Sequence, residues 1–313
     1  MKPIAATAAT LSAPTQGALW MTAAAVCFSA MIVLLRLATD ALHPFQVAFF
    51  RSFLGLVIML PWIVHTGLAG LRTRRLGLYG WRSATGLVAM LCWFMAVSLM
   101  PLGEAVALSF TAPLFATIGA AMFLGEIVRR RRWSATLIGF LGMLVILRPG
   151  TQALTLPAVL VLLSAVAAAG SALMVKALSR TESSTAMVAY MTIILTPLSL
   201  LPALFVWQWP DGGTLGVMAG IAALGTAGHL CFARSMKAAD ASAVIPFDYL
   251  RLPLVAVAGL LLFDETMDLW SWTGAGVIVA ATLYIARREA VVARERRPHD
   301  PAPVATGAAR EKL

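Results

Sequence analysis

Asp248 and Arg251 form the charged pair that lies deepest inside an apolar stretch of this sequence. They are three positions apart, so on a helix both side chains share one face and can neutralise each other. Pro246 and Pro253 flank the pair in the segment IPFDYLRLP and remove two backbone donors, which favours a kinked helix with carbonyl groups open to a ligand or an ion. The pair is therefore predicted to bind substrate or a proton, with a structural ion pair as the alternative.

Three more polar side chains could take part in the same chemistry. Arg51 lies deep enough in its apolar stretch to contact an anionic group, although an arginine near a span end can also snorkel to the membrane surface. Arg36 lies nearer a span end, and we expect its side chain to snorkel. His229 has an ordinary pKa of about 6.5, which suits proton coupling, and a hydrogen bond between helices is the alternative.

The elements that position these residues are apolar helices. Of the 313 residues, 60% are apolar and 12% charged, and the mean hydropathy is +0.85. Soluble domains carry about 25% charged residues, so a soluble fold could not bury this much apolar surface. Backbone polar groups in lipid must pair within their own segment, which makes each apolar stretch a helix. We predict an all-α membrane protein with ten spans, at residues 17–36, 45–64, 83–101, 104–125, 133–149, 156–176, 185–207, 214–233, 242–263 and 269–286.

The arginines and lysines indicate the orientation. Ten spans place both termini on one side, and 20 of the 24 basic residues, Arg82 among them, then fall on that side. The opposite connections near Asp211 and Asp264 contain none, so the positive-inside rule assigns the termini to the cytoplasm. The sequence thus predicts a multi-pass protein of the bacterial inner membrane. Residues 1–16 form a short cytoplasmic segment, and 288–313 form a basic, unstructured tail that can touch anionic lipid.

The two halves of the chain resemble each other weakly. Residues 29–33 match 171–175 at an offset of 142, residues 96–110 match 233–247 at an offset of 137, and Glu126 matches Glu265 at an offset of 139. This pattern predicts two copies of a five-helix unit, at 17–149 and 156–287, and sets Asp248 opposite Thr111. Because five is odd, the copies are expected to face opposite ways, as in many transporters.

Two matching segments carry a family resemblance. SFTAPLFATIGAAMFLGE and its partner PFDYLRLPLVAVAGLLLFDE resemble the drug/metabolite transporter superfamily, EamA-type family, over residues 17–287. The second copy departs from the family pattern by having Asp264-Glu265 where glycine-glutamate is usual. The resemblance implies a ten-helix fold and proton-linked or exchange transport of a small metabolite, with either export or import open.

Aromatic residues lie in helices that line the cavity of the resembled family. Trp93, Phe110, Phe247 and Tyr249 could form an aromatic pocket, with simple packing as the alternative. Together with the arginines, these aromatic residues slightly favour an anionic or zwitterionic metabolite with a planar portion as the substrate.

Other classes of protein fit the sequence less well. An enzyme is disfavoured, because the four histidines are scattered and no HExxH or paired-acid spacing is present. No metal site or disulfide is expected, since the three cysteines form no close pair, and no cofactor is expected. The basic residues behind the net charge of +10 are distributed by membrane side and form no soluble basic face, so nucleic acid is not an expected partner. A channel-forming subunit is the principal alternative, and either a monomer or a homodimer fits.

Overall fold

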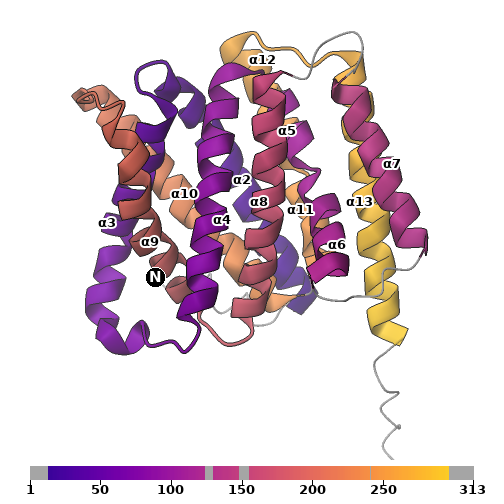
Figure 1. Ribbon diagram of the computed structural model, residues 1–313, viewed down its shortest axis with the longest axis horizontal. Helices are drawn as coiled ribbons and strands as arrows, with labels where there is room; N and C mark the ends of the chain where they lie inside the picture. Colours follow the sequence, from indigo (N-terminus) through magenta and orange to yellow (C-terminus); the bar gives the residue numbers. More distant parts are fainter. Residues whose placement is uncertain (1–12, 124–129, 148–154, 240, 296–313) are drawn as a thin grey trace, which may run out of the picture.

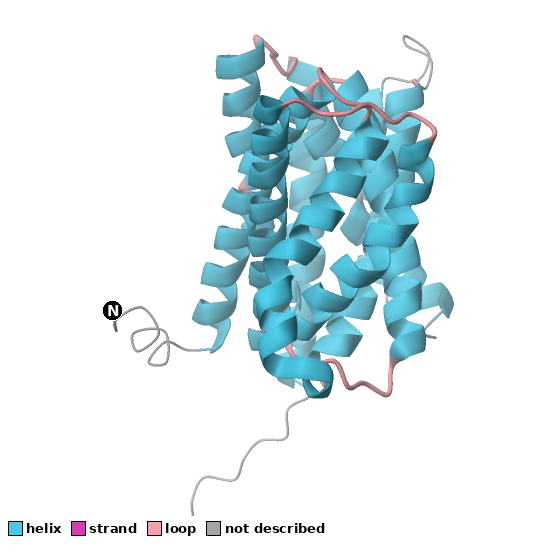
Figure 2. Cartoon of the chain, turned by 90° about the vertical axis from the view of Figure 1, so that its left-hand side faces the viewer, coloured by secondary structure: helices cyan, strands magenta, loops and turns pink. Residues whose placement is uncertain are grey.

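The computed structural model describes residues 13–123, 130–147, 155–239 and 241–295, and within them every regular element is an α-helix. The helices stand side by side with their connections at the two ends of the bundle (Figures 1 and 2). Their bounds are α2 (Ala13–Thr39), α3 (Pro44–Gly70), α4 (Leu76–Leu99), α5 (Leu102–Ser109), α6 (Ala112–Phe123), α7 (Arg130–Leu147), α8 (Leu156–Ser179), α9 (Ser184–Leu204), α10 (Gly212–Ala238), α11 (Ala241–Asp248), α12 (Arg251–Phe263) and α13 (Leu269–Glu295).

Eight apolar stretches in the described residues are long enough to cross a membrane, rather than the ten expected. The fifth and tenth expected spans correspond to shorter apolar segments, Trp133–Leu147 in α7 and Leu269–Ala281 in α13. Beyond its apolar part, α13 continues to Glu295, into the segment that the sequence assigned to the tail. Residues 1–12 of the expected N-terminal segment 1–16, residues 296–313 of the expected tail 288–313, and Glu126 lie outside the described residues.

Two of the long stretches are broken near their middles. The helix ends at Ser109 and resumes as α6 at Ala112, and in the second half it ends at Asp248 and resumes as α12 at Arg251. Pro253 has no N–H for the carbonyl of Tyr249, four residues earlier, and Leu252 N–H donates to that carbonyl instead at 3.1 Å. The kink that the prolines predict is confirmed.

From Leu99 and Ala238 to Phe123 and Phe263, matching helix ends of the two halves differ by 139 or 140 residues, which corrects the offset of 137 for the middle of each half. Ser109 and Asp248 both end a half-helix at a break, so Asp248 corresponds to Ser109 and not to Thr111. The sequence match at an offset of 137 rests on a few small and apolar residues, and for that reason the sequence alone placed this pair two residues out.

Polar contacts repeat at the same spacing. Arg36 Nη1 donates to the Val97 carbonyl at 2.6 Å, and in the second half Lys176 Nζ donates to the Met236 carbonyl at 2.9 Å. Lys176 also donates to the carbonyl of Ala239, a residue close to Gly17 near the start of α2, whereas Arg36 is near its end. The two matching contacts therefore lie at opposite ends of the bundle.

The α7–α13 crossing depends on Gly274. A Cβ added there would lie 2.5 Å from the backbone oxygen of Gly142, which cannot rotate away. Gly274→Val should therefore destabilise the protein by about 1–3 kcal/mol through overpacking. Thermal melting of the purified protein in detergent measures the loss, and Gly276→Val is the matched control, because nothing lies within 4 Å of a Cβ at Gly276. Equal melting temperatures for the two variants would contradict this account of the crossing.

Candidate functional site

The two broken helices meet in the interior of the bundle. Phe110 follows α5 and Tyr249 follows α11, and their ring centroids lie 4.7 Å apart in an edge-to-face arrangement. Both side chains are buried. Because Phe110 and Tyr249 occupy matching positions of the two halves, the contact brings the breaks together, and with them the backbone groups that the helices leave open.

The predicted pair of Asp248 and Arg251 forms at this point. Arg251 Nη2 donates to Asp248 Oδ2, and about a fifth of each side chain stays exposed, 22% and 21% respectively. The Arg251 guanidinium lies 5.8 Å from the ring centroids of both Phe28 in α2 and Phe110. Arg251 Nε is buried without a hydrogen-bond partner. The pair is thus partly exposed, and two aromatic rings lie within cation–π distance of Arg251.

His229 in α10 contacts the same Phe28 ring. The two ring centroids are 5.1 Å apart, edge to face, and a Cβ on neighbouring Gly228 would come within 2.7 Å of the Phe28 ring. The absence of a side chain at Gly228 therefore lets α2 and α10 approach closely. Arg51 Nε lies 3.2 Å from the position of a Cβ on Gly225, one turn before His229, and Arg251 lies near the same Phe28 ring as His229. These side chains therefore lie in one region of the bundle.

Arg51 is buried in α3 and does not snorkel. Only 6% of it is exposed, and Nη1 lies 3.7 Å from the Met90 sulfur in α4. Its Nε lies 3.2 Å from the position that a Cβ on Gly225 would take, so the glycine leaves room for the guanidinium against α10. The side chain faces the interior of the bundle, because α3 packs on α9 and α10 there.

Arg82 is a site residue that the sequence analysis assigned to a cytoplasmic connection. The helix begins at Leu76, seven residues before the expected start of the span, and Arg82 is 5% exposed within it. Its Nη1 donates to the Met187 carbonyl at 3.4 Å, and Nη2 lies 3.5 Å from the Met191 sulfur. The apolar run LGLYGW ahead of Arg82 was the available signal, because it lengthens the helix on the N-terminal side.

Trp93 and Phe247 are not joined to this group by any ring contact among the described residues. Trp93 is half-buried and packs against the apolar core, whereas Phe247 is 39% exposed. Phe110 and Tyr249 remain as the predicted aromatic residues in contact with each other at the breaks.

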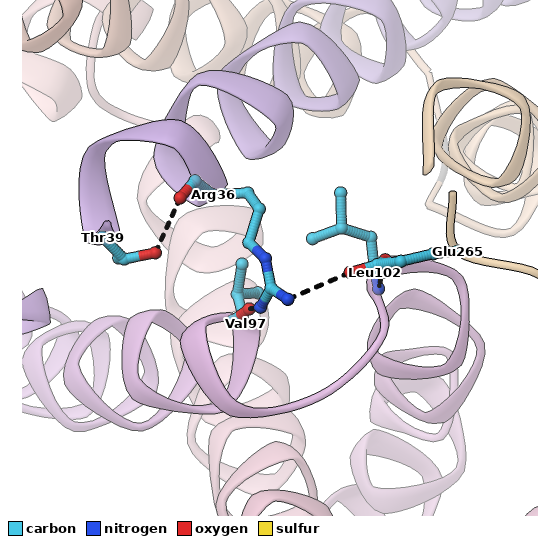
Figure 3. A network of polar contacts seen from close by, with 5 residues as sticks. All are labelled: Arg36, Thr39, Val97, Leu102 and Glu265. Carbon is cyan, nitrogen blue, oxygen red and sulfur yellow. Dashed lines mark hydrogen bonds and ion pairs between the residues drawn. The ribbon is translucent and has the colours of Figure 1, made fainter. Parts of the chain in front are cut away.

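A second polar network lies at the end of the bundle where α4 connects to α5 and α12 connects to α13, and Figure 3 shows it from close by. Arg36 Nη2 lies 3.1 Å from Glu265 Oε1, and Glu265 Oε2 accepts from the Leu102 N–H at 2.7 Å. Arg36, Val97, Leu102 and Glu265, here called the latch, therefore join α2, α4 and α5 to the α12–α13 connection. Arg36 was expected to snorkel, and it is instead held by a carboxylate and a carbonyl that its guanidinium fits.

An apolar contact between Gly103 and Met267 accompanies the latch at this end of the bundle. The Met267 Cγ lies 2.6 Å from the position that a Cβ on Gly103 would take, so the methionine occupies the space that the glycine leaves. Ser271 Oγ also lies 3.4 Å from Glu104 Oε1. Residues from the first half of the chain thus contact the second half at this end through both polar and apolar groups.

Comparison with known proteins finds relatives that match this chain over nearly the full length of both proteins. The chain is 35% identical to the riboflavin transporter of Vibrio cholerae over 91% of this chain and 97% of that protein. It is 32% identical to the S-adenosylmethionine uptake transporter of Rickettsia bellii, over 85% of this chain and 91% of that protein. The pseudopaline exporter of Pseudomonas aeruginosa is 28% identical over 87% and 96% of the two chains.

The fold and the repeat are found in the comparisons as well. A crystal structure with 17% sequence identity matches 88% of this chain and 99% of its own with a TM-score of 0.64, which shows a common fold. The model of the EamA-like transporter family matches twice, at residues 15–148 and 155–287. These matches cover both halves of an all-helical, multi-pass membrane protein, and the chain belongs to the EamA-like transporter family.

Proposed function

We propose that this chain is a secondary transporter that carries a small organic metabolite across the bacterial inner membrane by alternating access. The observation that carries the proposal is the charged site at which the broken helices of the two repeats meet. Broken helices expose backbone groups to a ligand at mid-membrane, and a site between two repeats can open to either side when the repeats rock. Its relatives bear the names of transporters, which supports a non-enzymatic role.

In this proposal the protein has ten spans in two inverted five-helix repeats, with α7 and α13 as the fifth span of each. The shorter apolar parts of α7 and α13 suffice if charged residues at their ends reach the membrane surface. Both termini lie in the cytoplasm, as the distribution of arginine and lysine favours. The latch then faces the periplasm.

The latch is the outer closure of the transport cycle. It joins the two halves of the chain through Arg36 and Glu265, so the outer end opens only when this ion pair separates. Lys176 occupies the matching position at the cytoplasmic end, where it contacts the Met236 and Ala239 carbonyls. Matching cations at the two ends support a cycle in which one end closes while the other opens.

The proposed substrate is an anionic or zwitterionic metabolite with a planar portion. The aromatic rings around Arg251 suit a planar group, and the buried guanidiniums suit an anionic one. Riboflavin and S-adenosylmethionine, which name two of the relatives, both contain a planar ring system. Both compounds are the first to be tested as transported solutes. Flux is measured in both directions, because one relative is named for uptake and another for export.

Flux in proteoliposomes tests the proposal. Radiolabelled probes should enter or leave with saturable kinetics, and either a pH gradient or unlabelled substrate on the opposite side should accelerate them. Flux at channel-like rates that responds to neither would overturn alternating access and favour the channel alternative.

A further inference from the structure

Arg51 and Arg82 are buried guanidiniums without a carboxylate partner in the described part of the chain. The ion pairs found there join Arg36 to Glu265 and Arg251 to Asp248. Arg51 is 6% exposed and Arg82 is 5% exposed, and both lie inside apolar helices of span length. A charged side chain at such a position is costly and in most cases marks a functional site.

The protein supplies these two side chains with thioether sulfurs and one long contact to a carbonyl. Arg51 Nη1 has the Met90 sulfur at 3.7 Å, and Arg82 has the Met191 sulfur at 3.5 Å and the Met187 carbonyl at 3.4 Å. A thioether sulfur is a weak acceptor, whereas a guanidinium offers five N–H donors. Arg82 Nε is also buried and has no hydrogen-bond partner. Both side chains therefore keep donors that an oxygen-rich anion could fill.

The two guanidiniums share one region of the interior. Arg82 contacts the Met191 sulfur in α9. One turn after Arg51 in α3, a Cβ on Gly55 would lie 3.4 Å from the side chain of Thr192, the next residue in α9. Two like charges in one region of low dielectric repel each other, and an anion between them would remove the repulsion. Neither charge is held by the Asp248–Arg251 pair, because Asp248 already bonds to Arg251. The cluster thus combines two unneutralised cations with one neutralised pair.

We propose that Arg51 and Arg82 bind the anionic group, a carboxylate or a phosphate, of the transported solute. Planar guanidiniums bind both groups through paired N–H···O bonds. The assignment rests on the proposed transport function, and it adds that the first repeat binds the anionic end of the solute. The rings of Phe28 and Phe110 near Arg251 then take the planar part.

Binding to the purified full-length protein in detergent tests the assignment. The probes are pairs that differ by one anionic group: riboflavin with riboflavin 5′-phosphate, adenosine with adenosine 5′-phosphate, and nicotinamide with nicotinate. In the wild type, the anionic member of at least one pair should bind at least tenfold more tightly than its neutral partner. Preference in the first two pairs indicates a phosphate, and preference in the third a carboxylate.

Arg51→Gln and Arg82→Gln should each abolish this preference, and Arg82→Lys should retain part of it. Arg72→Gln, at an exposed arginine of the α3–α4 connection, is the matched control and should retain all of it. The assignment is wrong if no pair shows a preference in the wild type, or if the preference survives both glutamine variants. If a variant fails to fold, the comparison of anionic and neutral probes on the wild type still tests whether the protein prefers an anionic group. Because binding is measured without flux, a protein that binds anions but moves no solute would overturn transport and leave the anion site standing.

Discussion

Asp248→Asn is expected to lower solute flux at least 100-fold while the protein still inserts and purifies as a monodisperse species. The substitution removes the carboxylate that holds Arg251 at the break between α11 and α12, and leaves the guanidinium without its partner at mid-membrane. A 100-fold loss of flux corresponds to about 2.7 kcal/mol in the transport barrier. A charge left unpaired inside an apolar span costs at least about 2.5 kcal/mol, so a loss of this size is expected. Arg251→Ala should have a similar effect. Flux in proteoliposomes of matched protein content is the measurement.

The matched control is Asp211→Asn. Asp211 is exposed at the start of α10, and its Oδ1 accepts from the Thr214 N–H at 2.6 Å. Asparagine caps a helix about as well as aspartate, so flux and stability should both stay at the wild-type level. A loss of flux in this variant would show that the assay responds to acidic residues in general.

A charge swap separates a binding role from a structural one. If Asp248 and Arg251 only join α11 to α12, the double variant Asp248→Arg/Arg251→Asp restores the ion pair and should recover most of the flux. If the pair contacts the solute or a proton, the swap reverses the field that the ligand meets and should stay inactive. Near-wild-type flux in the swapped protein, or in both single variants, would give the pair a structural role.

Much of the architecture was predictable, because a bilayer imposes length and composition on each helix. The apolar stretches predicted the long helices, and Pro246 and Pro253 predicted the break at Asp248 and Arg251. The ion pair was predictable too, since its members are three residues apart on one segment. These are local features, and local sequence determines them.

The latch and Arg82 were not predictable in this way. Arg36 and Glu265 come from opposite ends of the chain, and each on its own reads as a charge at a span end. Arg82 lies beside a basic connection, so charge counting placed it with that connection, whereas packing of α4 against α9 buries it. Both depend on which helices become neighbours, which periodicity and charge bias do not encode.

A disulfide across the latch end should stop transport. In a protein whose native cysteines are replaced, Gly103→Cys with Met267→Cys places two sulfurs where the glycine and the methionine now pack. The Met267 Cγ is 2.6 Å from the position of a Cβ on Gly103, and the Met267 Cβ is one bond further away. The two Cβ atoms therefore lie within about 4.1 Å of each other, inside the range of about 3.5–4.5 Å that a disulfide needs. The cross-link joins α5 to the α12–α13 connection and holds the outer end closed.

Oxidation of this double variant should abolish flux in proteoliposomes, and a reducing agent should restore it. Each single-cysteine variant should be indifferent to oxidation, which controls for damage to other groups. Glu265→Gln tests the same closure from the opposite side: it removes the charge that holds Arg36, so the outer end should open more often. A cysteine at Gly103 should then react faster with a membrane-impermeant maleimide. Full flux through the oxidised double variant would refute the latch, because a closure that stays shut throughout transport cannot be part of the cycle.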